Sequence, residues 1–408
     1  MSYLWETDAV LAATNGRPVG DMPEGITGIS IDSRTLKKGE AFFAIKGDQF
    51  DGHDFLPAAL RAGAAFAVVD ENRLVSMGGI NLPLIVVRDV LEAMTHLGLA
   101  ARARSKAQII AVTGSVGKTS VKEMLRTVLS YSGEVHASVA SFNNHWGVPL
   151  TLARMPSTTN YGIFEIGMNH PDEIRPLVKM VRPHVAMINN VAAAHLGAFD
   201  SIDDIARAKA EIFEGVVPGG YAVINHDDKR YTLQRDLAHE AEIEHLVTFG
   251  TKRGSDIWLR NLVQEDGGLK LDVRIKGEDY QYAMSMTGEH MAMNSLAVLA
   301  AASLAGADIR KTAEAMARVT PTDGRGTRYT IGGSGSMGIT LIDESYNANP
   351  ASMEAALNVL GSFESAKTKR RIAVLGDMLE LGKQSKKLHE GLAKFIADAK
   401  VDLVFLVG

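Results

Sequence analysis

The sequence predicts an α/β protein of three domains that is built largely from parallel sheets. Its 408 residues exceed the length at which one hydrophobic core stops growing, roughly 250–300 residues. From residue 108 onward, strand-like and helix-like runs alternate, which is typical of parallel sheets covered by helices. Changes in this pattern near residues 105 and 320 divide the chain into domains 1–105, 106–320 and 321–408.

The first domain combines short β-rich runs with turns. Strands are expected at residues 28–31, 41–45 and 65–69, and a helix at 56–62. An alanine-rich helix over 91–106 ends in a basic cluster and leads into the second domain. This part of the chain is therefore expected to form a small α/β module.

The second domain carries the longest alternating pattern. Strands are expected at 109–112, 162–166, 185–190 and 221–224, and helices at 118–129, 172–181, 201–213 and 291–305. Between residues 246 and 286, shorter strands at 257–262, 269–275 and 279–284 are separated by Glu265-Asp266-Gly267-Gly268 and Lys276-Gly277, which are hairpin sequences. They predict an antiparallel edge of the same domain.

The third domain follows a segment rich in Gly, Pro and Thr, residues 320–327. Strands expected at 339–342, 372–375 and 403–407 alternate with helices at 352–360 and 386–399, which predicts a βαβ arrangement. Because the chain stops on an apolar strand, we expect this domain to be incomplete.

Composition narrows the classes of partner. The net charge of -5 is small for this length, so it gives no indication of a nucleic-acid-binding surface. The absence of cysteine excludes disulfides and thiolate metal sites, and neither a signal peptide nor an apolar run of about 20 residues is present. We expect a cytoplasmic monomer that acts on small molecules and contacts neither nucleic acid nor membrane.

A glycine-rich loop follows the strand expected at 109–112. Its sequence is Thr113-Gly114-Ser115-Val116-Gly117-Lys118-Thr119-Ser120. Between a strand and a helix, such glycines let backbone N–H groups face a phosphate chain, and the helix N-terminus adds positive charge. Lys118 is suited to neutralise terminal phosphates and Thr119 to bind Mg²⁺. The general pattern has glycine where this chain has Val112, so the loop is a shorter variant.

Two polar side chains follow other strands of this domain. Glu165 ends a strand, where a carboxylate faces the crevice in which α/β proteins bind ligands, so it is a candidate Mg²⁺ ligand. The alternative is a carboxylate that accepts hydrogen bonds from backbone N–H groups. His195 follows the strand at 185–190, and the residues alone leave structural and functional roles equally open.

Lys209 lies on the apolar face of the helix expected at 201–213. Ile202, Ile205 and Ile212 define that face, and Ser201 with Asp204 supplies an N-terminal cap. A lysine among buried isoleucines needs a partner, a shifted pKa or a modification that removes its charge. The alternative is a buried stem that carries its ammonium group to water.

Together these residues resemble the Mur ligase family, and within it the members that add D-alanyl-D-alanine to UDP-N-acetylmuramoyl-tripeptide. The matching motifs follow the family order: the phosphate loop and residues 143–150, 165–169, 194–197, 209–213, 288–290 with Asn294, 343–350 and 375–382. The last two are the most specific, since they separate these members from those that add a single amino acid.

The resemblance implies an N-terminal domain that binds the UDP end of the precursor, a central ATPase and a Rossmann-like C-terminal domain that closes over the site. The implied reaction uses ATP and two Mg²⁺ and passes through an acyl phosphate. The residues implied to bind the nucleotide are Gly114, Ser115, Gly117, Lys118, Thr119, Ser120, Asn294 (adenine), Asp343 (ribose) and Arg325 (γ-phosphate).

The resemblance also implies metal, catalytic and substrate residues. Thr119 and Glu165 would bind one Mg²⁺ and His195 a second, and Lys209 matches the family's carbamylated lysine. Lys118, Lys209, His195 and Glu165 would be catalytic. For the uridine nucleotide, the implied binding residues are Ser33 and Arg34, together with residues 51–53. The other residues implied to bind substrate are Asn143, Asn144, Tyr346, Asn347 and Asn349. One departure is His290-Met291, where members often carry His-Asn.

Other functions remain open. The chain resembles, more distantly, family members that add a single amino acid, although residues 346–350 argue against them. An ATP-binding protein without catalysis is a second alternative. A GTPase switch is disfavoured because the guanine-reading Asn-Lys-x-Asp motif is absent.

Overall fold

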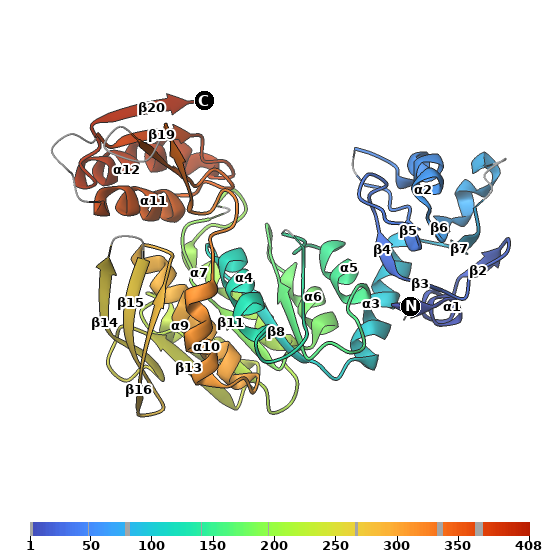
Figure 1. Cartoon of the computed structure of the whole chain (residues 1–408), viewed down its shortest axis with the longest axis horizontal. Helices are drawn as coiled ribbons and strands as arrows, with labels where there is room; N and C mark the ends of the chain where they lie inside the picture. Colours follow the sequence, from blue (N-terminus) through green and yellow to red (C-terminus); the bar gives the residue numbers. More distant parts are fainter. Residues whose placement is uncertain are drawn as a thin grey trace.

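The computed structural model describes residues 3–47, 49–77, 82–139, 141–194, 196–265, 268–332, 338–363 and 370–408. It confirms the α/β class: sheets and helices form three bodies in chain order, with the N-terminal body beside the central one and the C-terminal body above it (Figure 1). Within the described ranges, no helix is long and apolar enough to cross a membrane.

The N-terminal body is a five-stranded sheet with helices. Its strand order is β2 (Arg17–Val19), β7 (Leu84–Val87), β6 (Phe66–Asp70), β5 (Glu40–Phe43) and β4 (Gly28–Ser30), with only β2 antiparallel. Helices α1 (Thr7–Thr14), α2 (Leu56–Ala62) and α3 (Val90–Arg104) accompany it, and β1 (Trp5–Glu6) pairs with β3 (Gly25–Ile26). On α3, Arg102 donates to the carbonyls of Val181 and Arg182 at 2.7 Å each, which fixes this body to the central one.

The central body is a nine-stranded sheet. Its order is β16 (Glu278–Met284), β15 (Gly268–Ile275), β14 (Ile257–Glu265), β13 (His245–Gly250), β12 (Tyr221–Asn225), β11 (Val185–Ile188), β8 (Gln108–Thr113), β10 (Tyr161–Glu165) and β9 (Val135–Ala137). β14, β15 and β16 pair antiparallel and all other neighbours are parallel, so the predicted antiparallel edge is confirmed. Lys276 and Gly277 form the β15–β16 turn with φ values of 50° and 88°.

Helices cover both faces of this sheet. One face carries α4 (Lys118–Leu129), α9 (Glu289–Leu304) and α10 (Ile309–Ala315), and the other carries α5 (Gly147–Ala153), α6 (Ile174–Val181), α7 (Ile202–Ala210) and α8 (Tyr231–Glu240). Along β8, Ile110 and Val112 pack into the first core, and Ile109 and Ala111 into the second. A strand buried on both sides must be continuously apolar, which explains its sequence.

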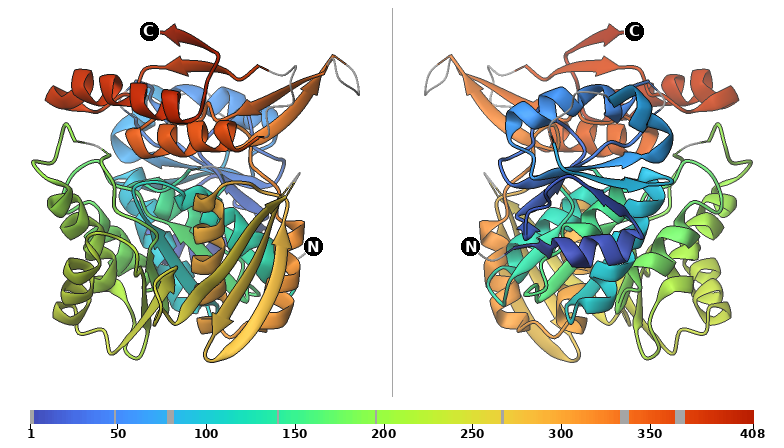
Figure 2. Two further views of the ribbon diagram at one scale, coloured as in Figure 1. Left: turned by 90° about the vertical axis from the view of Figure 1, so that its left-hand side faces the viewer. Right: turned by 90° about the vertical axis from the view of Figure 1, so that its right-hand side faces the viewer.

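The C-terminal body contains two separate two-stranded sheets. β17 (Thr327–Ile331) pairs antiparallel with β18 (Ile339–Asp343), whereas β19 (Ile372–Gly376) and β20 (Leu403–Val407) are parallel. Helices α11 (Pro350–Ser362) and α12 (Ser385–Asp398) pack together against β19, and the β17–β18 hairpin projects to one side (Figure 2).

The expectation of one βαβ arrangement over 339–407 is wrong for its first strand. β18 does not join β19 but pairs with β17, which was not predicted because Thr327–Ile331 alternates polar and apolar residues directly after a turn-rich segment. The strands and α-helices of the described chain that sequence patterns did not predict are β1, β2, β3, β7, β9, β13, β17, α1, α5, α8 and α10. Most of them are short.

Candidate active site

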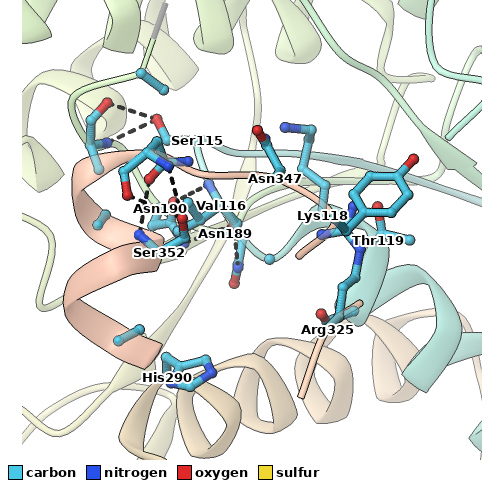
Figure 3. Close-up of a pocket in the computed structure, with 18 of the residues that line it drawn as sticks. Ser115, Val116, Lys118, Thr119, Asn189, Asn190, His290, Arg325, Asn347 and Ser352 are labelled. Atoms are coloured by element: carbon cyan, nitrogen blue, oxygen red, sulfur yellow. Dashed lines mark hydrogen bonds between the residues drawn. The ribbon is translucent and has the colours of Figure 1, made fainter. Parts of the chain in front are cut away.

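A cavity of about 520 Å³ lies between the central and C-terminal bodies. The loop after β8, the ends of β10 and β11 and the start of α9 line one side, and the linker before β17 and the start of α11 line the other (Figure 3). The predicted site residues that line it are Ser115, Gly117, Lys118, Thr119, Ser120, Asn143, Glu165, Asn294, Arg325, Tyr346, Asn347 and Asn349. The C-terminal ends of neighbouring parallel strands thus bring together residues far apart in sequence.

Lys118 begins α4 and curls back over the loop. Its Nζ donates to the carbonyl of Gly114 at 2.8 Å. Burial lowers the pKa of Lys118, the Glu165 carboxylate opposes that shift, and the charge of Arg325 adds to it. An anion placed between these two cations would relieve both the burial cost and their repulsion.

Two asparagines that the sequence did not assign hold the loop in shape. Asn190 accepts from the N–H of Val116 at 3.0 Å through Oδ1, and its Nδ2 donates to the Val116 carbonyl, also at 3.0 Å. Asn189 donates to Oδ1 of Asn294 at 2.8 Å. Both directly follow β11, which lies next to β8 in the sheet. Their position at the C-terminal end of a parallel strand is the sequence feature that could have identified them as site residues.

Glu165 is 1% exposed and accepts two hydrogen bonds from side chains. Thr119 Oγ1 donates at 3.0 Å and Asn143 Nδ2 at 2.8 Å. These side-chain donors replace the backbone N–H groups of the alternative interpretation. A hydroxyl and a carboxylate beside a phosphate loop are oxygen ligands of the kind that Mg²⁺ prefers.

Metal binding here would rely on few protein ligands. Across the part of the chain that the structure describes, no group of three or more His, Cys, Asp or Glu side chains is arranged to hold a metal. Mg²⁺ commonly keeps several waters and shares phosphate oxygens, so Thr119 and Glu165 fit such an ion. His195, the predicted ligand of a second ion, lies outside the described residues.

Lys209 is buried on α7, with 1% of its surface exposed, which contradicts the alternative of an ammonium group in water. Ser201 accepts from the N–H of Asp204 at 3.1 Å, so the predicted cap is present, and Ile205 and Ile212 are buried as expected. Burial, with a smaller effect of Lys118, places the pKa of Lys209 well below its ordinary value. Its ammonium has no hydrogen-bond partner among the described residues. Burial therefore favours the neutral amine over the ammonium more than it would at an exposed lysine.

Several predicted residues do not line the cavity. The Asn144 side chain accepts from Gly147 N–H at 3.0 Å at the start of α5, and Asp343 accepts from Ser345 N–H at 3.0 Å. Gly114 contributes its carbonyl to Lys118. Asn349, which does line the cavity, also caps α11 through Ser352.

The predicted uridine-binding residues lie in the N-terminal body. Arg34 forms an ion pair with Asp32 at 2.7 Å, and its side chain is 86% exposed; Ser33 lies between them in sequence. Asp51 accepts from His53 Nδ1 at 2.6 Å, and His53 Nε2 accepts from Asp70 N–H at 3.0 Å. With both ring nitrogens used internally, His53 orders its loop.

Glu344, which sequence reasoning missed, lines the cavity next to Arg325. Burial is the main reason that the pKa of Glu344 rises from 4.5 to about 7. The positive charge of Arg325 opposes the rise, and the negative charge of Asp343 adds to the rise. The folded protein thus keeps a proton on Glu344 between about pH 4.5 and 7 that the unfolded chain releases. Stability falls as pH rises through this window, and the loss is complete above pH 7.

Glu344→Gln, which is uncharged at every pH, should therefore raise the midpoint of thermal unfolding at pH 8 by about 4 °C. The gain should shrink towards zero at pH 5. Scanning calorimetry at the two pH values checks this, with Glu390→Gln on the exposed face of α12 as the matched control. An equal gain at both pH values would show that ionisation of Glu344 is not its cause.

Three models of known protein families match successive parts of this chain. The Mur ligase family catalytic domain matches residues 25–114, the Mur ligase middle domain 112–302 and the Mur ligase glutamate ligase domain 328–408. Together they span most of the chain.

Individual relatives of this chain also carry the names of Mur ligases. The UDP-N-acetylmuramoyl-tripeptide–D-alanyl-D-alanine ligase of Rickettsia prowazekii is 36% identical over 93% of this chain and 82% of its own. The ligase of the same name from Escherichia coli is 33% identical over 93% and 81%. Among solved structures, MurF from Acinetobacter baumannii superposes with a TM-score of 0.86 at 30% identity, covering 99% of this chain and 86% of that one.

A solved structure with a bound nucleotide is also similar. MurF from Thermotoga maritima, in complex with ADP, superposes with a TM-score of 0.75 at 25% identity, over 93% of this chain and 87% of that one. The order of the family models, the identity to the relatives and the shared fold lead to one conclusion: the chain belongs to the Mur ligase family.

Proposed function

We propose that this protein is an ATP-dependent ligase that joins the amine of D-alanyl-D-alanine to the terminal carboxylate of UDP-N-acetylmuramoyl-tripeptide. The observation that carries the proposal is the single cavity that has the phosphate loop on one wall and the Tyr346–Asn349 segment on the other. The relatives that match this chain over about four fifths of their own length carry the name of this ligase.

The chemistry requires activation of a carboxylate. Carboxylate acylates poorly because oxide is a poor leaving group, so its oxygen attacks the γ-phosphorus of ATP, giving an acyl phosphate and ADP. The amine of the dipeptide then attacks the acyl carbon, phosphate leaves, and the amine loses a proton. Catalysis of this kind depends mainly on positioning and on electrostatic stabilisation.

The wall of the cavity supplies that stabilisation. The loop N–H groups and Lys118 hold the phosphate chain, and Arg325 faces the γ-phosphate from the linker before β17. Thr119 and Glu165 would hold one Mg²⁺ and His195 a second, and the ions would supply further positive charge to the phosphoryl group. Asn143 orients the Glu165 carboxylate through its 2.8 Å hydrogen bond.

Lys209 is proposed to carry a carbamate. Its buried, neutral amine is the form that combines with CO₂, releasing a proton and turning a buried cation site into a carboxylate. Asn294 is proposed to contact adenine and Asp343 the ribose, and Ser33 and Arg34 the uridine nucleotide. The reaction belongs to the cytoplasm, where cell-wall precursors are made.

The test is phosphate release from ATP by the 408-residue protein with UDP-N-acetylmuramoyl-tripeptide. We expect release to require D-alanyl-D-alanine and to yield the pentapeptide precursor by mass spectrometry. D-Alanine alone and L-alanyl-L-alanine are the controls. Release that ignores the dipeptide, or that needs a single amino acid instead, would refute the assignment.

A further inference from the structure

We propose that Ser141 is a positioning residue: its hydrogen bond to Tyr346 holds the phenol ring against Arg325, so that the guanidinium faces the phosphate loop and recognises the terminal phosphate of a bound triphosphate. This inference deepens the proposed function and rests on it for the role of the bound ATP. Neither Ser141 nor its bond to Tyr346 was singled out by sequence patterns.

Ser141 belongs to a segment fixed to the central body. The segment connects β9 with α5, and at its start Lys122 of α4 donates to the carbonyl of Ser138 at 2.9 Å. Further along, Asn143 donates to Glu165, and its carbonyl accepts from Gly167 N–H at 2.9 Å. Ser141 therefore lies on backbone that is tied to the phosphate-loop helix on one side and to the end of β10 on the other.

Tyr346 is fixed at its backbone by the segment that carries Arg325. Its N–H donates to the carbonyl of Gly324 at 3.2 Å. Gly324 has a φ of 70°, and a Cβ there would lie 2.9 Å from Tyr346 Cβ. The backbone at residue 324 can therefore approach the backbone at residue 346 this closely only because residue 324 is glycine. The near end of the tyrosine side chain is thus set by the C-terminal body.

Ser141 fixes the other end of the same side chain. Its Oγ lies 2.8 Å from the Tyr346 hydroxyl, which joins the two bodies across the cavity that both residues line. The Arg325 guanidinium lies over the ring, with Cζ 4.1 Å from its centroid. A cation in that position is attracted to the ring face, so fixing the ring limits where Arg325 can point.

The direction matters because Arg325 faces another cation. Figure 3 shows Arg325, Lys118 and Thr119 gathered on one side of the cavity, whereas His290 lies at its far end. Both Arg325 and Lys118 line this cavity, so their positive charges face the same space. Without the Tyr346 platform, Arg325 would be free to turn towards solvent, and the site would lose the charge that distinguishes a triphosphate from a diphosphate.

The experiment compares two nucleotides. In the presence of Mg²⁺, titration calorimetry should measure the affinity for ADP and for adenylyl imidodiphosphate, a non-hydrolysable triphosphate, in wild type, Ser141→Ala, Tyr346→Phe and the double variant. Each single variant should bind the triphosphate about 3- to 10-fold more weakly, the loss expected for one hydrogen bond, with ADP affinity unchanged. The double variant should be no worse than either single one, because both remove the same bond.

A matched control is a different side-chain hydrogen bond between these bodies, from Gln264 Nε2 to Ser362 Oγ at 2.7 Å. Ser362→Ala removes that link without touching the phosphate loop, so it should leave both affinities unchanged. Equal weakening of ADP and triphosphate by Ser141→Ala, or additive losses in the double variant, would overturn the proposal. Neither measurement uses a peptide substrate, so failure of the ligase assignment would be seen separately.

Discussion

Lys209→Ala should reduce the turnover number for phosphate release by about 10²- to 10³-fold, the size expected when a group that supports charge stabilisation is removed. The buried side chain has no hydrogen-bond partner within the described ranges, and burial lowers its pKa and so disfavours the ammonium, which is why we expect a carbamate to be the form that acts. Added formate or acetate, which fit the space of the lost carbamate, should restore part of the activity.

The modification itself can be observed. Wild-type protein equilibrated with ¹³C-bicarbonate at pH 8 should show one slowly exchanging carbamate signal by NMR, absent in Lys209→Ala. Arg207→Ala, an exposed cation two residues earlier on the same helix, is the control and should keep both signal and activity. Full activity of Lys209→Ala, or its loss without any rescue by small carboxylates, would argue against the carbamate.

Gly117→Ala should weaken nucleotide binding by about 100-fold, from backbone strain together with a displaced buried hydrogen bond, or ~3 kcal/mol in total. Gly117 has a φ of 81°, and an added Cβ would lie 2.7 Å from Asn189 Nδ2 and 2.9 Å from Asn294 Oδ1. The new methyl group would push apart the 2.8 Å bond between these two side chains. ADP affinity by titration calorimetry is the measurement.

The variant Gly306→Ala is the control that separates the effect of backbone strain at a positive φ from the effect of crowding by the added Cβ. Gly306 lies just after α9 and has a φ of 84°, nearly the value at Gly117, but nothing lies within 4 Å of the Cβ that alanine would add there. We expect Gly306→Ala to lower thermal stability slightly and to leave ADP affinity as in wild type. If both variants weakened ADP binding equally, the crowding of Asn189 and Asn294 would not be the cause.

Much of the central fold was predictable because its signals are local. The apolar run at Ile109, the helical spacing that begins at Lys118 and the glycine turn at Gly277 each reflect short-range chemistry, and the structure has a strand, a helix and a hairpin there. The pairing of β18 with β17 was not predictable in this way. It depends on which strands meet in space, and residues 327–331 carry only a weak pattern.

The same division holds for the site. Sequence alone identified the phosphate loop, Glu165 and the anomaly of Lys209, because each is an unusual residue type in a recognisable local pattern. Only the tertiary structure showed that both Glu165 oxygens accept from side chains, that Lys209 is too buried to reach water, and that Ser141 meets Tyr346. A hydrogen bond between residues 205 positions apart leaves no periodic pattern in a sequence. How deeply a side chain is buried, and which way it points, likewise depend on how the whole chain packs.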